Sequence, residues 1–108
     1  MNFPLFSPSY GLSVNVVGAV ASANVELTSA ARPLGPTAAV ELLNVGTQVM
    51  FVKFGGDNSV AATSADYPVG PGDRVVLPMP SFATGSVWVA AISPAVGSTL
   101  YCTGGSTN

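Results

Sequence analysis

Short apolar runs interrupted by glycine and proline are the feature that most limits how this chain can fold. Twelve glycines and nine prolines are spread along its 108 residues. No stretch of about ten residues keeps the helical hydrophobic period of roughly 3.6 residues. Several runs alternate apolar with polar residues, as strands with one buried face do. About eight such runs at regular spacing predict an all-β sandwich or small barrel.

The alternation is clearest in the first runs. Val14 and Val16 alternate with Ser13 and Asn15, and Val25 and Leu27 alternate with polar neighbours in the next run. Further strands are expected at residues 38–43, 48–54, 60–63, 67–69, 74–77, 86–92 and 99–103. We therefore predict a single-domain antiparallel β-sandwich or small barrel, jelly-roll-like, of about eight short strands.

The two ends of the chain differ from this pattern. Residues 1–11, "MNFPLFSPSYG", are predicted to form an extended N-terminal arm, because Pro4 and Pro8 disfavour helix. The apolar side chains of the arm need a surface, either on their own domain or on a neighbouring subunit. The β-sandwich domain is expected at residues 12–103. The last segment, 104–108, reads "GGSTN" and is predicted to be a flexible tail.

The run from residue 48 to residue 54 has apolar residues on both faces. Val49 and Phe51 point one way, and Met50, Val52 and Phe54 point the other. This pattern indicates either a central strand or a strand pressed between subunits. Lys53, its one charged residue, is expected to reach water through its long stem.

The chain is poor in charge, with three basic and five acidic residues and a formal net charge of −2. Its surface must then consist largely of uncharged side chains and backbone. We expect much of it to be covered by other subunits; the alternative is a monomer kept soluble by hydroxyl and amide groups. Nucleic acid is not an expected partner, because the basic residues are not clustered. A membrane is not expected either, because no uninterrupted apolar run reaches the ~18 residues of a span.

Candidate chemistry is sparse. The chain has no histidine, which excludes Ser-His and Cys-His nucleophiles and histidine-based metal sites. Cys102 lies in the strand-like run "TLYCT" and is predicted to be a buried thiol. Asp66 and Asp73 flank a Gly-Pro-Gly turn, and no spacing requires them to meet. We expect no enzymatic activity and no cofactor.

The run Gly55-Gly56-Asp57-Asn58-Ser59 raises the question of a metal or phosphate site. Calcium loops alternate their ligands and add a distant bidentate carboxylate, and phosphate loops end in Gly-Lys-Ser/Thr before a helix. Neither pattern is present. We predict a turn in which the glycines supply positive φ and Asp57 and Asn58 cap backbone groups. No metal is expected. Downstream, "PGDRVV" predicts a turn followed by a surface pair of Asp73 and Arg74.

From Ala38 onward the chain resembles small structural proteins of tailed bacteriophages. The pattern is "VELLNVGTQVMFVKFGGDNSVAATSADYPVGPGDRVVLP", followed by "VWVAAISPAVGSTLYCTGG". The similarity covers about residues 38–105 and rests on the punctuation of strands by turns. It implies a β-sandwich of the phage head or head-tail region, with no catalytic residues to transfer.

The resemblance implies a structural role without placing the protein on the capsid or at the neck and tail. Together with the low charge and the apolar arm, it leads us to expect a capsid decoration or cement protein that binds the major capsid protein as a small homo-oligomer such as a trimer. Its location would be the virion, assembled in the cytoplasm of the host bacterium. One alternative is a neck or tail structural protein, and another is a receptor- or glycan-binding module in which Trp88 could serve as a sugar platform. The residues predicted at interfaces are Phe3, Leu5, Phe6, Tyr10, Met50, Val52, Phe54 and Trp88.

Overall fold

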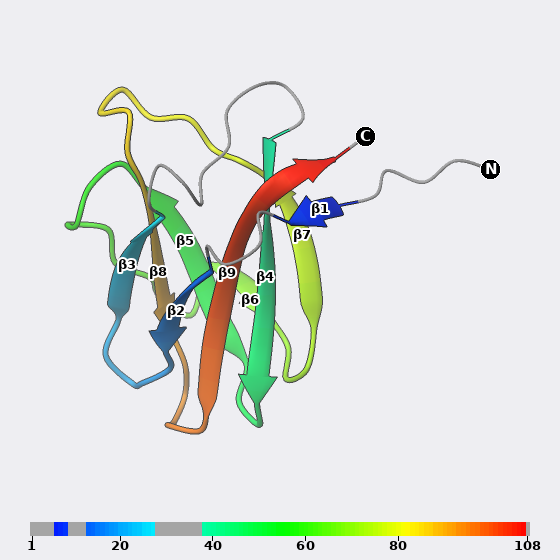
Figure 1. The fold of residues 1–108 in the computed structure, drawn as a ribbon. Helices are drawn as coiled ribbons and strands as arrows, with labels where there is room; N and C mark the ends of the chain where they lie inside the picture. The colour runs from blue at the N-terminus through cyan, green and yellow to red at the C-terminus, as the bar shows by residue number, and fades with distance from the viewer. Residues whose placement is uncertain (1–5, 9–12, 28–37, 108) are drawn as a thin grey trace.

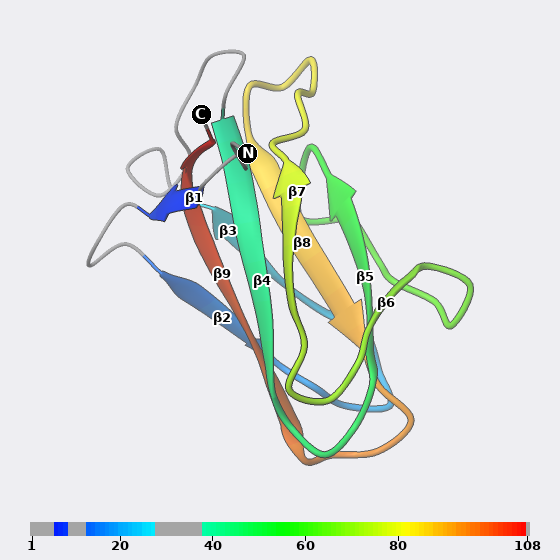
Figure 2. The same cartoon turned by 90° about the vertical axis from the view of Figure 1, so that its right-hand side faces the viewer.

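A computed structural model describes residues 6–8, 13–27 and 38–107 of the chain. Within these residues, nine strands form two antiparallel sheets that face each other (Figures 1 and 2). The five-stranded sheet, called sheet A, contains β1 (Phe6–Pro8), β2 (Val14–Val17), β9 (Ser98–Thr107), β4 (Ala38–Gly46) and β7 (Arg74–Pro78). The four-stranded sheet, called sheet B, contains β3 (Ala23–Leu27), β8 (Val87–Ile92), β5 (Met50–Gly55) and β6 (Tyr67–Val69).

The order of pairing defines the fold. β2 pairs with β9, β3 with β8, β4 with β7 and β5 with β6, and these nested pairs alternate between sheet A and sheet B. Such a nested, alternating order is that of a jelly roll, and β1 adds a short extra strand beside β9. The predicted all-β, jelly-roll-like sandwich is therefore confirmed.

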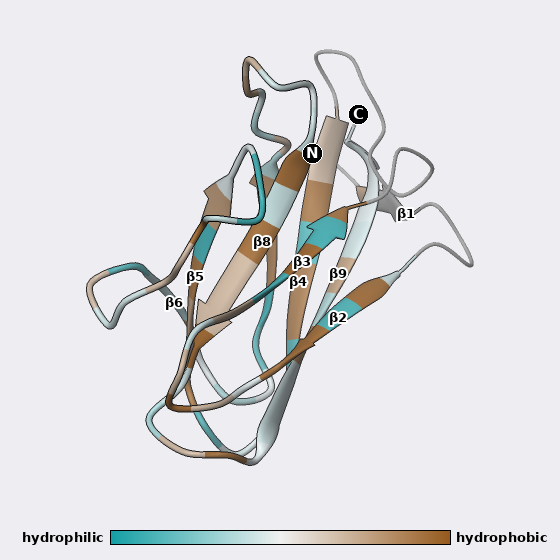
Figure 3. Ribbon diagram, turned by 90° about the vertical axis from the view of Figure 1, so that its left-hand side faces the viewer, coloured by the Kyte–Doolittle hydropathy of each residue, from teal (hydrophilic) through white to brown (hydrophobic). Residues whose placement is uncertain are grey.

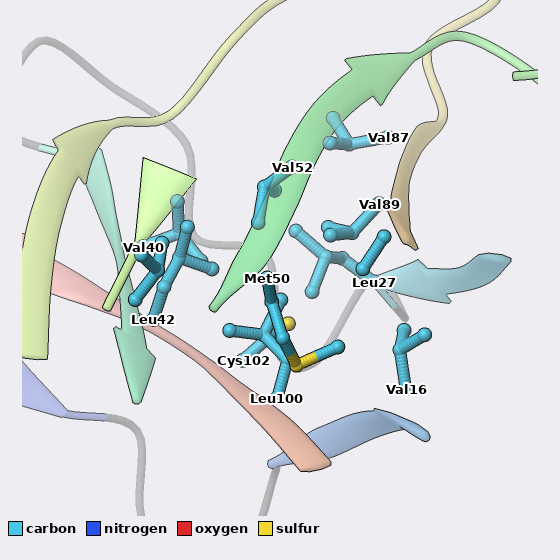
Figure 4. Packing of buried hydrophobic residues seen from close by; sticks show 12 residues of the cluster. Val16, Leu27, Val40, Leu42, Met50, Val52, Val87, Val89, Leu100 and Cys102 are labelled. Carbon is cyan, nitrogen blue, oxygen red and sulfur yellow. The ribbon is translucent and has the colours of Figure 1, made fainter. Parts of the chain in front are cut away.

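The core lies between the two sheets and follows the alternation of each strand. Figure 4 shows Val40, Leu42, Leu100 and Cys102 from sheet A facing Met50, Val52, Val87 and Val89 from sheet B. Each of these side chains is at most 4% exposed. Full burial of one such aliphatic side chain contributes about 1.5–3 kcal/mol, so this layer is the main source of stability.

Several predicted boundaries needed correction. Residues 104–107 are not a flexible tail: β9 continues to Thr107, with Gly104 opposite Val40 and Gly105 opposite Ala39. Glycine is a weak strand former, but here the chain pairs with a neighbour on each side, and this pairing outweighs the local propensity. The predicted strand at 60–63 is wrong, because these residues lie in the loop between β5 and β6.

The N-terminal arm is described only in part. Residues 6–8 are extended, as predicted, and form β1, in which Phe6 lies opposite Thr107 of the same chain. Phe3, Leu5 and Tyr10 lie outside the described residues. No described segment is a helix long and apolar enough to cross a membrane.

The loop between β5 and β6 covers part of the outer side of sheet B. Figures 2 and 3 both show it extending beyond this sheet, on the side away from sheet A. The Asn24 side-chain amide on β3 donates to the carbonyls of Asn58 (2.9 Å) and Val60 (3.1 Å), which attaches the loop to the sheet edge. Ala90 points outward on β8 and is nevertheless fully buried. The outer side of sheet A is the face with more exposed apolar side chains.

Candidate functional site

The loop that follows β5 contains a turn stabilised by its own hydrogen bonds, and it does not resemble an ion site. The Ser59 backbone N–H donates to Asp57 Oδ1 at 2.9 Å, the Ser59 hydroxyl donates to the same oxygen, and Val60 N–H donates to the Asp57 carbonyl at 3.3 Å. The hydroxyl and then the backbone bond from Ser59 lower the pKa of Asp57. Among the described residues, no three acidic or cysteine side chains gather as a metal site would require. Asp57 therefore caps a turn, as predicted.

The role predicted for the two glycines before this turn is wrong. Neither Gly55 nor Gly56 has a positive φ. They are needed for close approach instead, because a Cβ on Gly55 would lie 2.5 Å from the Val60 Cβ. Glycine at this position lets the loop fold back onto the strand it has just left.

Two of the remaining acidic residues, Asp66 and Glu41, have structural partners. Asp66 Oδ2 accepts a hydrogen bond of 2.7 Å from Thr63 N–H within the loop. The predicted Asp73–Arg74 pair does not form in the structure, where Arg74 Nε lies 3.6 Å from Glu41 Oε2 on the neighbouring strand. Side chains of adjacent residues on a strand point to opposite faces, whereas Glu41 and Arg74 share one face.

The outer face of sheet A combines exposed apolar side chains with neutral charge. We call this surface the open face. Its members are ten outward residues of β2, β9, β4 and β7, namely Asn15, Val17, Thr99, Tyr101, Thr103, Glu41, Leu43, Val45, Arg74 and Val76. Four of them are large apolar or aromatic residues with high exposure: Val17 63%, Val45 50%, Tyr101 40% and Val76 40%. The charges of Glu41 and Arg74 compensate each other.

The cross-strand register brings these residues into rows. Val17 and Val45 lie on either side of Thr99, and Asn15 and Leu43 lie on either side of Tyr101. Directly opposite residues on neighbouring strands are about 5 Å apart, so each row is a continuous strip of side chains. The open face is thus one surface assembled from four strands that are distant in sequence.

Hydrogen bonds fix the loops at the end of the sandwich where Val17 and Val45 lie. Gly18 N–H donates to the Ser98 carbonyl at 2.8 Å, and Ser93 N–H donates to the Ala19 carbonyl at 2.9 Å. These bonds join the β2–β3 corner to the β8–β9 connection. Val20 and Val96, in these two loops, are 69% and 74% exposed and extend the apolar surface beyond the sheet. Figure 3 shows hydrophobic segments in both loops.

The opposite end of the open face borders a shallow groove of about 400 Å³. Phe6 of β1, Ala39 of β4, and Val76 and Pro78 of β7 contribute to its lining. Phe6 is half-buried there. The groove and the open face therefore share Val76.

The structure places the other predicted interface residues differently. Met50 is fully buried and Val52 is 4% exposed in the chain's own core, so the prediction that they face another subunit is wrong. The inward face of β5 meets sheet A, which satisfies the apolar pattern without a partner. Phe54 packs against the same core. Trp88 is half-buried on the outer side of sheet B, with Glu26 and Gly55 opposite it.

Val17, Val45, Tyr101 and Val76 are not among the interface residues predicted from the sequence. The sequence nevertheless contains a signal for them. Each lies at a solvent-facing position of an alternating strand, where its neighbours are polar residues such as Asn15, Thr99 and Arg74. Large apolar residues at such positions are candidates for a contact outside the chain.

The chain was compared with models of protein families, with curated proteins and with solved structures, and none of the three comparisons found a match.

Cys102 is fully buried in the core, as predicted, and burial raises the pKa of its thiol from the ordinary value of 9.0 to about 12. We expect no reaction with a thiol reagent such as DTNB in the folded protein at mildly alkaline pH, and complete reaction after unfolding in guanidinium. The contribution of the Cys102 thiol to the free energy of unfolding is fully present below the thiol pKa of the unfolded chain. This contribution is lost as the pH rises toward the folded-state pKa of about 12. Rapid reaction of the folded protein would contradict this arrangement.

Proposed function

We propose that this chain is a non-enzymatic structural protein of a tailed-phage virion, and that it decorates the capsid by binding the major capsid protein as a homo-oligomer. The observation that carries the proposal is the open face. It exposes Val17, Val45, Tyr101 and Val76, while its two charges pair with each other. Surfaces of this kind, with exposed apolar side chains and low net charge, are typical of protein–protein contacts.

Two further features support the proposal. The whole chain carries only eight charged residues (three basic, five acidic), so a second protein can cover it with little desolvation of ions. The jelly-roll order of the strands recurs in viral capsid domains and also in lectins. This fold support is by analogy alone, because one fold hosts many functions.

Repetition on a lattice makes such a small domain effective. Each copy presents a modest contact, and a homo-oligomer engages several sites at once, so that the avidity exceeds the affinity of a single copy. The described residues hold no metal cluster, and the carboxylates of Asp57, Asp66 and Glu41 have structural partners. The proposed contribution is thus mechanical: it ties neighbouring capsid subunits together.

The test is attachment to purified capsids that lack this protein. The double variant Val17→Glu and Val45→Glu places two unpaired carboxylates on the open face, and we expect its attachment to fall by at least about tenfold. Ser64→Glu, in the exposed β5–β6 loop, is the matched control and should attach like the wild type. Circular dichroism verifies that both variants fold. Wild-type attachment by the double variant would overturn the role of the open face.

Electron microscopy of intact particles tests the location. Density for this chain repeated over the whole shell is the expected result. Density confined to the tail axis would instead favour the alternative of a neck or tail protein. Absence of the chain from purified virions would reject both versions.

A further inference from the structure

β7 is an open edge of sheet A. It pairs with β4 on one side, with Leu43 opposite Arg74 and Ala39 opposite Pro78. Among the described strands, none pairs with its other side, and Figure 1 shows β7 at the margin of the sheet. An unpaired edge presents backbone donors and acceptors to any strand that can reach it.

The hydrogen-bond phase shows which groups point outward. Met79 N–H donates to the Ala38 carbonyl and Asn44 N–H donates to the Asp73 carbonyl, both at 3.0 Å. Because the bonded pairs of an antiparallel ladder alternate, Val75 and Leu77 also bond to β4. The N–H and C=O groups of Arg74 and Val76 therefore point away from β4, as does the Pro78 carbonyl.

The edges of sheet B are better protected than β7. β6 has only three residues, and its middle residue is Pro68, which has no N–H to offer. On β3, the Asn24 side chain binds the β5–β6 loop, and Glu26 is exposed. On β7, Pro78 and Arg74 protect the two ends, and Val76 in the middle is 40% exposed.

We propose that β7 pairs with β7 of a second copy, antiparallel, about a two-fold axis through Val76. In this register the two Val76 residues exchange two backbone hydrogen bonds. Arg74 N–H of each copy donates to the Pro78 carbonyl of the other. The symmetric contact buries Val76 against Val76 and joins the two open faces into one surface.

Charge favours a second copy and this register. The Arg74 charge is already compensated by Glu41 of its own chain, so two identical edges meet without excess charge. With the axis at Val76, the two Arg74 residues lie about 13 Å apart along the strands. An axis at Val75 allows the same number of hydrogen bonds, but it brings the two arginines to within about 8 Å of each other, where like charges are unfavourable.

This pairing deepens the proposed function and rests on it, since it names the contact that makes the homo-oligomer. It is nevertheless measured without capsids. A monomeric wild-type chain that still attaches to capsids would reject the β7 contact and the homo-oligomer, and would leave the proposed capsid decoration standing. A wild-type chain that dimerises but does not attach to capsids would reject the proposed function and leave the β7 contact standing.

The decisive variant is Val76→Pro, compared with Val76→Thr. Proline removes the outward N–H at the centre of the contact without removing a bond to β4, whereas threonine keeps the N–H and the strand propensity. We expect the wild type and the threonine variant to sediment as dimers in a series from micromolar to millimolar concentration. The proline variant should dimerise about tenfold to a hundredfold more weakly. A wild type that is monomeric throughout, or a proline variant that dimerises equally well, would overturn the proposal.

Cross-linking gives a second readout that does not depend on the proline variant folding. Paired residues at the axis have Cα atoms about 5.5 Å apart, within the range of a disulfide. Val76→Cys should form covalent dimers under mild oxidation. Val17→Cys is the control, because it is exposed on the same face but lies on β2, at the opposite margin. The native Cys102 is buried and does not interfere. Failure of Val76→Cys to cross-link, or equal cross-linking by Val17→Cys, would reject this register.

Discussion

Replacement of Gly46 by alanine should destabilise the domain by at least about 3 kcal/mol and lower its thermal midpoint by roughly 15 °C. Gly46 ends β4 with a φ of +143°, a conformation that residues with a Cβ rarely adopt. A Cβ there would lie 2.1 Å from the Gly97 carbonyl oxygen and 2.6 Å from the Ser98 Cα. These are backbone atoms of a neighbouring segment of the same chain, at the start of β9. The steric overlap can therefore be relieved only if β4 and β9 move apart.

The matched control for this prediction is Gly72→Ala. Gly72 also has a positive φ, of +77°, but a Cβ at this position would meet no atom within 4 Å. Gly72→Ala should therefore lower the free energy of unfolding only through the unfavourable backbone conformation, by about 1–2 kcal/mol. Thermal or urea unfolding of both variants measures the difference. Equal losses of stability would show that steric contact at Gly46 is not the cause.

The second large effect is expected at Asn44, which is fully buried in β4. Its side-chain Nδ2 donates to the carbonyls of Gln48 and Val69, each at 2.8 Å, and so joins β4 to the β4–β5 turn and to β6. Asn44→Ala removes both of these bonds. The Gln48 carbonyl still accepts a hydrogen bond from the Ser98 hydroxyl, whereas the Val69 carbonyl loses the buried donor that Asn44 supplies. We expect a loss of about 2–4 kcal/mol in the free energy of unfolding.

Asn58→Ala is the control for Asn44→Ala. Asn58 is exposed, and its bond to Asn24 uses its backbone carbonyl, which alanine retains. Its effect should stay within about 0.5 kcal/mol. Urea unfolding at equilibrium gives both values. An Asn44→Ala variant as stable as Asn58→Ala would mean that the buried amide contributes nothing.

Within single strands, much of this fold could be predicted. The inward phase of Val40 and Leu42, the outward phase of Glu41 and the burial of Cys102 all follow from a period of two residues. The turn at Asp57 was also predictable, because it depends on a local bond from a short side chain to a backbone group two residues away. Local chemistry determined these features.

The candidate site could not be predicted in the same way. Val17, Val45 and Tyr101 belong to three strands, and the register alone makes them neighbours. The pattern of β5 fits a central strand or an interface, and only the position of sheet A shows that Met50 and Val52 are core.

The strand character of the chain and the buried face of most strands follow from the order of the residues alone, because side-chain direction alternates locally along an extended backbone. Which strands pair, which sheet the β5–β6 loop covers and which face remains open depend on the folded molecule. Pairings such as β2 with β9 join residues far apart in the chain. Their choice depends on the packing of the whole sandwich, which no local pattern encodes.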